Sequence, residues 1–215
     1  LSDSGGRMTG DGTVPVRVEG LEMRYGSFLI QRELTFDINR GDQFDYLVSM
    51  SADGTEGNRS ADINTSLIRT VNGQTITLYF DTKLPRPYDL IYRVQGTRGI
   101  CMASADKIYI EGRSHKLDTW ESMETYYEEF EHPLWKTLGD QASRRGGGDW
   151  LEMHRLIKAL RTGTPPDMDV YDAATWSCIT ELSQKSVASR SGPMDFPDFT
   201  RGRWQTTEPI GIIGA

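Results

Sequence analysis

Residues 66–80 read SLIRTVNGQTITLYF, with an apolar-rich arm on either side of Asn72-Gly73. An Asn-Gly pair between two such arms is a strong hairpin signal, and it predicts a type I′ turn with positive φ at both central residues. On the second arm, over 75–80, threonine and tyrosine alternate with isoleucine, leucine and phenylalanine. Alternation of this kind is typical of a strand with one buried face. We therefore predict an antiparallel hairpin with arms at 65–71 and 74–80.

Outward from this hairpin, the first half of the chain is rich in strand patterns and the second half in helix patterns. Further strands are predicted at 13–18, 28–36, 43–50, 89–94, 99–102 and 107–111. A helix over 121–130 is expected to end before Pro133, and Asp149 and Asp169 are expected to cap helices over 150–161 and up to about 187. Strands followed by helices predict an α+β fold, with a large open, mostly antiparallel sheet covered on one face by helices. Residues 1–12 are expected to form a flexible lead-in, and 13–215 a single α+β domain.

The composition argues against a nucleic-acid-binding protein and against a membrane-spanning one. The chain has 215 residues, 37% hydrophobic and 26% charged, with a net charge of −7. An acidic chain of this kind is not expected to bind nucleic acid, and no apolar run is long enough to cross a membrane. Cys101 and Cys178 both lie in apolar runs, so two buried thiols are preferred over a disulfide. The compartment, cytoplasmic or periplasmic, stays open.

Most motifs that carry chemistry are missing. The sequence contains no Gly-x-Gly-x-x-Gly fingerprint, no phosphate loop, no zinc-ligand spacing and no Gly-x-Ser-x-Gly nucleophile elbow. We therefore expect no catalytic residue, no metal site and no cofactor site of this chain's own. A cofactor-independent hydrolase would need a pair of carboxylates across a cleft, drawn from Asp45, Asp81, Asp89 and Glu111.

The segment Leu84-Pro85-Arg86-Pro87-Tyr88 follows the second arm of the hairpin. Its two prolines remove two backbone donors and restrict φ, so the segment cannot continue a sheet ladder. One interpretation is a rigid loop that presents Arg86 and Tyr88 to a ligand; the other is a surface turn in which the tyrosine stacks on proline. Asp81 would either orient Arg86 or form an ordinary exposed ion pair with it.

Several long phrases together resemble one family. They are DINRGDQFDYLVSMS (37–51), the stretch 62–100 around the hairpin and the proline loop, KIYIEGRS (107–114), YYEEFEHPLWKTLG (126–139), the stretch 149–188 that begins DWLEMHRLIKALRTG, and FPDFTRGRW (196–204). They are similar to the C-terminal domain of the NAD-dependent glycosidases represented by bacterial α-N-acetylgalactosaminidase. That family lies within the glucose-fructose oxidoreductase/inositol dehydrogenase superfamily.

The resemblance implies a specific function. Family members carry an N-terminal Rossmann domain that binds NAD, absent from this chain, and an α+β domain whose sheet walls the sugar site and mediates oligomerisation. Their reaction passes a hydride from the sugar C3 to NAD, eliminates the glycosidic bond, adds water and returns the hydride. The family tyrosine that matches Tyr88 contacts the sugar. This chain is then expected to bind a sugar or glycoside, to form a homo-oligomer in a bacterium, and to need NAD only through an upstream domain.

Two departures from the family pattern bear on activity. Where the family has Tyr-Pro-Thr-His, residues 23–34 read MRYGSFLIQREL, with Ser27 near the place of the histidine. Where the family has Gly-His-Gly-Gly, Arg145 replaces the histidine, and arginine does not act as a general base at neutral pH. Arg145 and the glycines after it are predicted to bind an anionic ligand at a helix N-terminus, or else to form a solvated loop. We expect an inactive sugar-binding domain or, alternatively, a stand-alone carbohydrate-binding or oligomerisation module.

Overall fold

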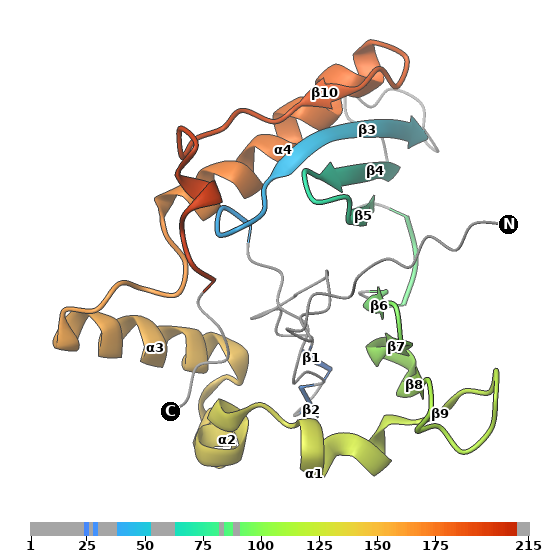
Figure 1. Ribbon diagram of the computed structural model, residues 1–215, viewed down its shortest axis with the longest axis vertical. Helices are drawn as coiled ribbons and strands as arrows, with labels where there is room; N and C mark the ends of the chain where they lie inside the picture. Colours follow the sequence, from blue (N-terminus) through green and yellow to red (C-terminus); the bar gives the residue numbers. More distant parts are fainter. Residues whose placement is uncertain are drawn as a thin grey trace, which may run out of the picture.

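The computed structural model describes residues 24–25, 28–29, 38–52, 63–81, 84–87 and 91–209. Its fold class is α+β, as predicted, with an antiparallel β region and four α-helices (Figure 1). The lead-in over 1–12 and the strand expected at 13–18 lie outside the described residues, as does most of the strand expected at 28–36. Within that region the structure describes the short pair β1 (Arg24–Tyr25) and β2 (Phe28–Leu29).

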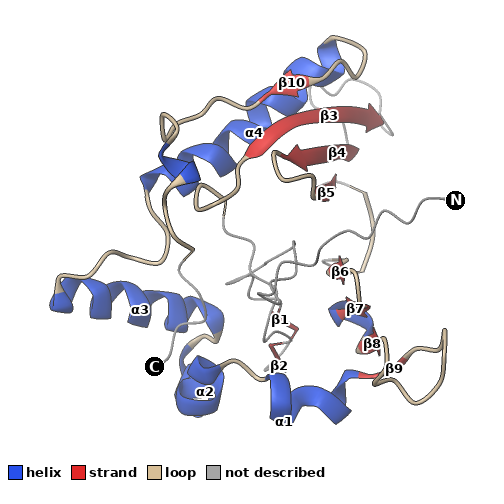
Figure 2. Cartoon of the chain, viewed as in Figure 1, coloured by secondary structure: helices blue, strands red, loops and turns tan. Residues whose placement is uncertain are grey.

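The predicted large sheet is present as two open four-stranded sheets, which Figure 2 shows in separate parts of the molecule. The first has the order β10-β3-β4-β5 and the second the order β6-β7-β8-β9, and all neighbouring strands in both are antiparallel. The strands of the first sheet are β3 (Phe44–Ala52), β4 (Ile63–Thr70), β5 (Thr75–Asp81) and β10 (Met194–Asp195). Those of the second are β6 (Arg93–Gln95), β7 (Gly99–Met102), β8 (Lys107–Ile110) and β9 (Glu121–Ser122).

The hairpin at Asn72-Gly73 is confirmed, but its predicted turn type is wrong. Gly73 has a φ of 96°, whereas Asn72 is not among the residues with positive φ. The Gly73 amide donates to the Thr70 carbonyl (3.0 Å) and the Thr70 amide to the Gln74 carbonyl (2.9 Å), as in a longer loop with glycine in the left-handed position. Asn72 instead serves a tertiary contact, since its side chain donates to the Gly41 carbonyl at 2.9 Å.

A long helix, α4 (Val170–Ala188), covers one face of the first sheet. Buried Leu47 and Ile68 pack there with Phe44 and Phe196, whose rings meet edge to face at 5.0 Å. Polar groups share this contact: the Ser186 hydroxyl accepts from the Ser49 amide (2.8 Å) and donates to the Gly192 carbonyl (2.7 Å). The core of the first sheet therefore combines apolar packing with fully paired hydroxyls.

The start of α4 is fixed by the cap that the sequence predicts. The Asp169 carboxylate accepts from the amides of Tyr171 and Asp172, and Asp172 accepts from the Asp169 amide, which completes a capping box. The Asn39 side chain donates to Asp172 (3.2 Å), so the turn before β3 is attached to the same helix end. Burial is the largest influence on Asp172 and raises the pKa of its carboxyl.

The second sheet packs on short helical turns. These are η1 (Ala103–Ala105), η2 (Met123–Tyr126) and α1 (Tyr127–Phe130). The single helix predicted over 121–130 is wrong, because that range holds β9, η2 and α1. Cys101, Ile108, Met123 and Tyr126 form the core of this half. Cys101 is a buried free thiol and Cys178 a half-buried one, which confirms the preference for thiols over a disulfide.

Pro133 begins a helix that the sequence analysis did not anticipate. In α2 (Pro133–Arg145) proline occupies the first turn, where its missing N–H costs nothing, and the His132 Nδ1 accepts from the Leu134 amide at 3.1 Å. After Gly146 and Gly147, both with positive φ, α3 (Gly148–Thr162) starts two residues before the predicted first residue, 150, and its N-cap is Gly147 instead of the expected Asp149. It ends at Thr162, one residue beyond the predicted end at 161, and its C-cap Gly163 is in the left-handed region.

The C-terminal segment returns to the first sheet. It adds β10 along β3, buries Phe196, and continues through η3 (Arg203–Gln205). The aromatic and basic stretch 196–204 thus packs back on the body, directly after the edge strand β10.

Candidate functional site

The proline loop begins at the end of β5, where Asp81 anchors it. The Asp81 Oδ1 accepts from the Leu84 amide at 3.1 Å, and its Oδ2 lies 3.2 Å from the Arg86 Nε. The Arg86 Nη2 also donates to the Asp81 backbone carbonyl at 3.2 Å. Only 4% of the Asp81 side chain is exposed, against 37% for Arg86. Of the two predicted roles, Asp81 therefore has the orienting one, because a buried carboxylate holds the base of a partly exposed guanidinium.

The remainder of this loop is only partly described. Pro85, Arg86 and Pro87 are exposed and outside any strand, which agrees with a segment that cannot pair in a sheet. Tyr88, the second predicted ligand contact, lies outside the described residues. Its contact with a ligand stays a prediction.

Arg145 lies at the C-terminal end of α2, next to the glycine-rich junction with α3. Its guanidinium lies over the Trp150 ring, 5.8 Å from the centroid, and that ring stacks on His154 at 5.2 Å. Arg145 is exposed, so its charge lies at the surface in a cation–π contact with Trp150.

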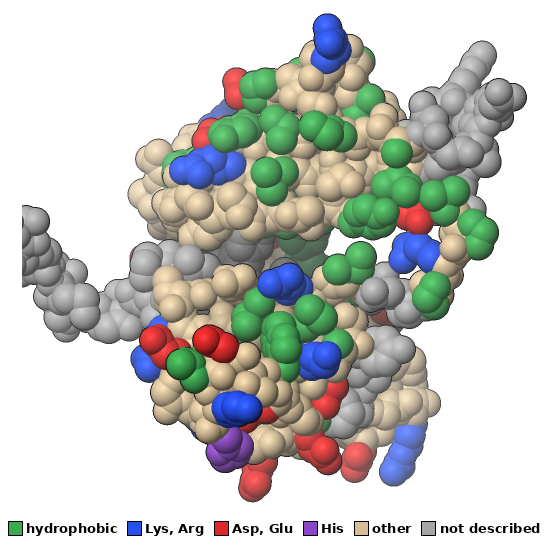
Figure 3. All heavy atoms as spheres, turned by 90° about the vertical axis from the view of Figure 1, so that its right-hand side faces the viewer, with side chains coloured by type: hydrophobic (Ala, Val, Ile, Leu, Met, Phe, Trp, Pro, Cys, Tyr) green, Lys and Arg blue, Asp and Glu red, His purple; other side chains and the backbone are tan. Residues whose placement is uncertain are grey.

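The structure does not bring these two arginines together. Figure 1 draws the β5–β6 connection and the α2–α3 junction on opposite sides of the molecule. In Figure 3 the surface is hollowed between the half that holds the first sheet and the half that holds the second. A single site that uses both Arg86 and Arg145 is not formed by the described residues alone.

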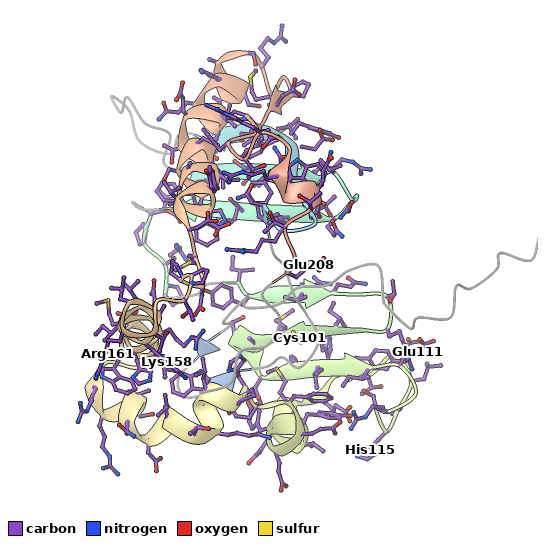
Figure 4. All side chains as sticks on the ribbon, turned by 60° about the vertical axis from the view of Figure 1, so that its left-hand side comes forward. Cys101, Glu111, His115, Lys158, Arg161 and Glu208 are labelled. Atoms are coloured by element: carbon purple, nitrogen blue, oxygen red, sulfur yellow. The ribbon has the colours of Figure 1, made fainter. Side chains whose placement is uncertain are left out.

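The carboxylate-pair alternative finds no support in the positions of its members. Asp45 lies at the end of β3 that pairs with Thr70, whereas Asp81 pairs with Ile63 at the other end of the sheet. At about 3.3 Å per residue, the intervening strand separates them by roughly 20 Å, twice the span of a glycosidase pair. Figure 4 shows Glu111 just beyond the end of β8 in the second sheet, and Asp89 lies outside the described residues.

Sequence reasoning missed a polar cluster on the second sheet. The Glu121 carboxylate accepts hydrogen bonds from Ser114 and from the Tyr126 hydroxyl (2.6 Å), and the bond from Ser114 is the largest cause of its lowered pKa. Nearby, Arg113 pairs with Glu129 and lies over two aromatic rings. The cluster holds the loop 111–120 against η2 and α1. No pattern in the sequence predicts the cluster, because its members come from separate elements.

The described residues form neither a metal-binding group nor a dinucleotide-binding unit. Among them, no group of three or more His, Cys, Asp or Glu side chains is placed to hold a metal ion. A dinucleotide-binding unit needs parallel strands joined by a helix and a glycine-rich turn, and the strand pairs of both described sheets are antiparallel. The described part of the chain therefore contains no dinucleotide-binding unit of this type. In the same residues, no helix is both long and apolar enough to span a bilayer.

Comparison with known proteins decides the family. The family described as "Glycosyl hydrolase 109, C-terminal domain" matches residues 55–206, which include β4, β5 and β10 of the first sheet, the whole second sheet and the four α-helices of the described residues. The chain belongs to glycosyl hydrolase family 109. The predicted resemblance to glycosidase C-terminal domains is thereby confirmed at the level of the family.

Family 109 proteins from several bacteria are similar over most of the chain. The protein from Solibacter usitatus is 43% identical over 195 residues and the one from Shewanella pealeana 43% over 201 residues. These matches cover 81% and 83% of this chain but only 44% of each relative. The WlbA dehydrogenase from Bordetella pertussis, solved with NADH and UDP-GlcNAcA, aligns over 72% of the chain with a TM-score of 0.46 and 13% identity.

Proposed function

We propose that this chain is the sugar-binding C-terminal domain of a longer, NAD-dependent glycoside hydrolase of the redox-elimination type. Family 109 membership supports the general class. The observation that carries the sugar-binding part is Arg86, held by the nearly buried Asp81 carboxylate at the end of β5 and flanked by two prolines. It is a cation fixed on a stiff loop.

A fixed guanidinium suits the recognition of sugar hydroxyls. Arginine offers five N–H donors in a planar fork and no acceptor, and the contacts to Asp81 engage Nε and Nη2. The prolines and the ion pair restrict the loop before any ligand arrives, so less conformational entropy is lost on binding. On this proposal Tyr88 adds a second contact from the same loop.

The catalytic groups belong to the part of the protein outside this chain. The described residues contain no dinucleotide-binding unit, and Arg145 occupies the position at which the family that this chain resembles has a histidine. We therefore propose that this chain binds sugar but does not hydrolyse a glycoside without the rest of the protein.

Titration calorimetry of the 215-residue chain with N-acetylgalactosamine and a panel of other monosaccharides tests the proposal. Removal of a charged hydrogen-bond partner by Arg86→Ala should weaken the Kd about ten- to hundredfold, while the free energy of unfolding changes by less than about 2 kcal/mol. Tyr88→Phe should weaken binding less. Arg113→Ala is the matched control, because Arg113 is also an exposed, ion-paired arginine but lies on the second sheet's outer loop.

Two results would reject this function. The first is a chain that binds none of the sugars although circular dichroism shows it folded. The second is an Arg86→Ala variant whose affinity equals that of the Arg113→Ala variant.

The open face of the first sheet supports the alternative, an oligomerisation module. Met50, Leu67 and Tyr79 are exposed on the side of β3, β4 and β5 that faces away from α4, and Figure 3 shows groups of hydrophobic side chains on the surface of both halves. Open sheets with such faces are commonly covered by a second copy. Sedimentation velocity should detect a dimer or larger assembly that Leu67→Glu disrupts, whereas a monomer at all concentrations would count against this alternative.

A further inference from the structure

Helix α3 carries two apolar faces, and the described residues pack closely on one of them. Leu151 and Ala159 are buried, and Leu151 packs with Trp135 and Ala142 of α2. On the other side, four large apolar side chains are exposed, with exposed fractions of 53%, 39%, 50% and 74% for Met153, Leu156, Ile157 and Leu160.

These four residues form one continuous stripe. They occupy positions i, i+3, i+4 and i+7 of a single helix, which places them on one face. We call them the α3 stripe. Arg155 lies on the buried side, where it is paired with Asp167 of the following loop (2.6 Å), and Figure 4 shows Lys158 and Arg161 beside the same helix. The stripe is therefore an apolar band on an otherwise charged helix.

A stripe of this kind differs from ordinary surface hydrophobics. Single exposed apolar side chains are normal and need no partner, but anchors at i, i+3, i+4 and i+7 are the pattern by which a helix docks against another protein surface. Contiguous apolar patches on proteins mark interaction sites.

We propose that the α3 stripe is the docking surface for the part of the natural protein that precedes this chain. The family match is to a C-terminal domain, and the chain spans 44% of the length of its relatives, so family 109 members hold a further, larger part before it. This inference rests on family membership and goes beyond the proposed sugar binding.

The size of the stripe favours an occupant on the same polypeptide. A stable dimer of separate chains buries about 800 Å² on each partner, more than four side chains of one helix supply. A domain linked covalently needs less contact area, because the linkage holds it at a high effective concentration. A second copy of this chain is therefore the weaker occupant.

Thiol labelling of Leu160→Cys tests the proposal in two proteins, the 215-residue chain and the full-length product of the same gene. Leu117→Cys is the matched control, since Leu117 is also a leucine with 74% exposure but lies on the outer loop of the second sheet. The rate with a soluble maleimide should fall at least about tenfold for Leu160→Cys in the full-length protein, because docking hides the site, and should stay unchanged for Leu117→Cys. Met153→Cys gives a second readout if Leu160→Cys does not fold.

Several outcomes would overturn the proposal: equal Leu160→Cys rates in the two proteins, equal slowing at both positions, protection that rises with concentration in the 215-residue chain, or a gene with no preceding domain. Labelling does not depend on sugar binding, so failure of the proposed function would leave its result unchanged.

Discussion

Helices α3 and α4 follow each other in the chain, and both have apolar residues at helical spacing, but α4 packs along the first sheet whereas α3 packs against helix α2. The residues of α4 that are fully buried against the first sheet are polar: Asp172, Thr175, Ser183 and Ser186. In α3 the large apolar residues Met153, Ile157 and Leu160 face outward. The contrast teaches that an apolar period shows which residues can be buried, whereas the neighbouring elements decide which ones are.

The largest expected effect is on the free energy of unfolding, when an apolar side chain in the core beneath α4 is truncated and compared with one on the surface of α3. Leu47 has no exposed surface and packs under α4, so Leu47→Ala should lower the free energy of unfolding by about 2–5 kcal/mol. Leu160→Ala on α3 should change it by no more than about 0.5 kcal/mol. Urea denaturation measures both. An equal loss in the two variants would mean that the α3 stripe is already covered within this chain.

A smaller loss of stability is expected when a buried hydroxyl group of α4 is removed. Ser186→Ala leaves the Ser49 amide and the Gly192 carbonyl without their partner, which should cost about 1–3 kcal/mol in urea denaturation. Ser183→Ala is the control, because among the described residues the Ser183 hydroxyl bonds only back to the Thr180 carbonyl of its own helix, and its loss should cost about 0.5 kcal/mol or less. If the two variants were equally stable, the hydroxyls would contribute nothing beyond space filling.

The smallest expected effect is a dependence of stability on pH, and it distinguishes α2 from α4. Helix α4 is capped by a carboxylate, whereas α2 is capped by the neutral form of His132. Burial, followed by the nearby Arg155 charge, lowers the pKa of His132 from its ordinary 6.5. The unfolded chain therefore takes up the proton more readily, so this contribution to stability is complete above pH 6.5 and is lost as the pH falls through the lowered pKa.

Thermal unfolding of His132→Asn between pH 7 and pH 5 measures that contribution. Asparagine also caps a helix but does not titrate, so the variant should lose part of the decline in stability that the unsubstituted chain shows. The contribution is bounded by the value of a cap, about 1 kcal/mol. His115→Asn, on the exposed loop of the second sheet, should retain the full decline. A decline in His132→Asn identical to that of the parent chain would assign the pH dependence to other groups.

Features that depend on a few neighbouring residues were predictable. The hairpin at Asn72-Gly73, the Asp169 cap and the end of α3 at Gly163 each follow from the conformational preference of one or two residues. The errors arose where one residue allows two outcomes. Pro133 can end one helix or begin another, and only the His132 cap and the packing of Trp135 select the second. Asn72 suits a type I′ turn, but its contact with Gly41 belongs to a different element.

In the candidate site, too, some features follow from the local sequence and others from tertiary packing. The sequence by itself determined a stiff segment around Arg86, because two prolines restrict φ and remove backbone donors wherever they occur. It also determined the α+β class, since strand patterns precede helix patterns along the chain. Only the tertiary structure decided that Asp81 is nearly buried beneath Arg86, that Arg145 lies apart from it, and that the apolar stripe of α3 is uncovered. These depend on which surfaces meet, and burial is a property of pairs of elements that no single segment carries.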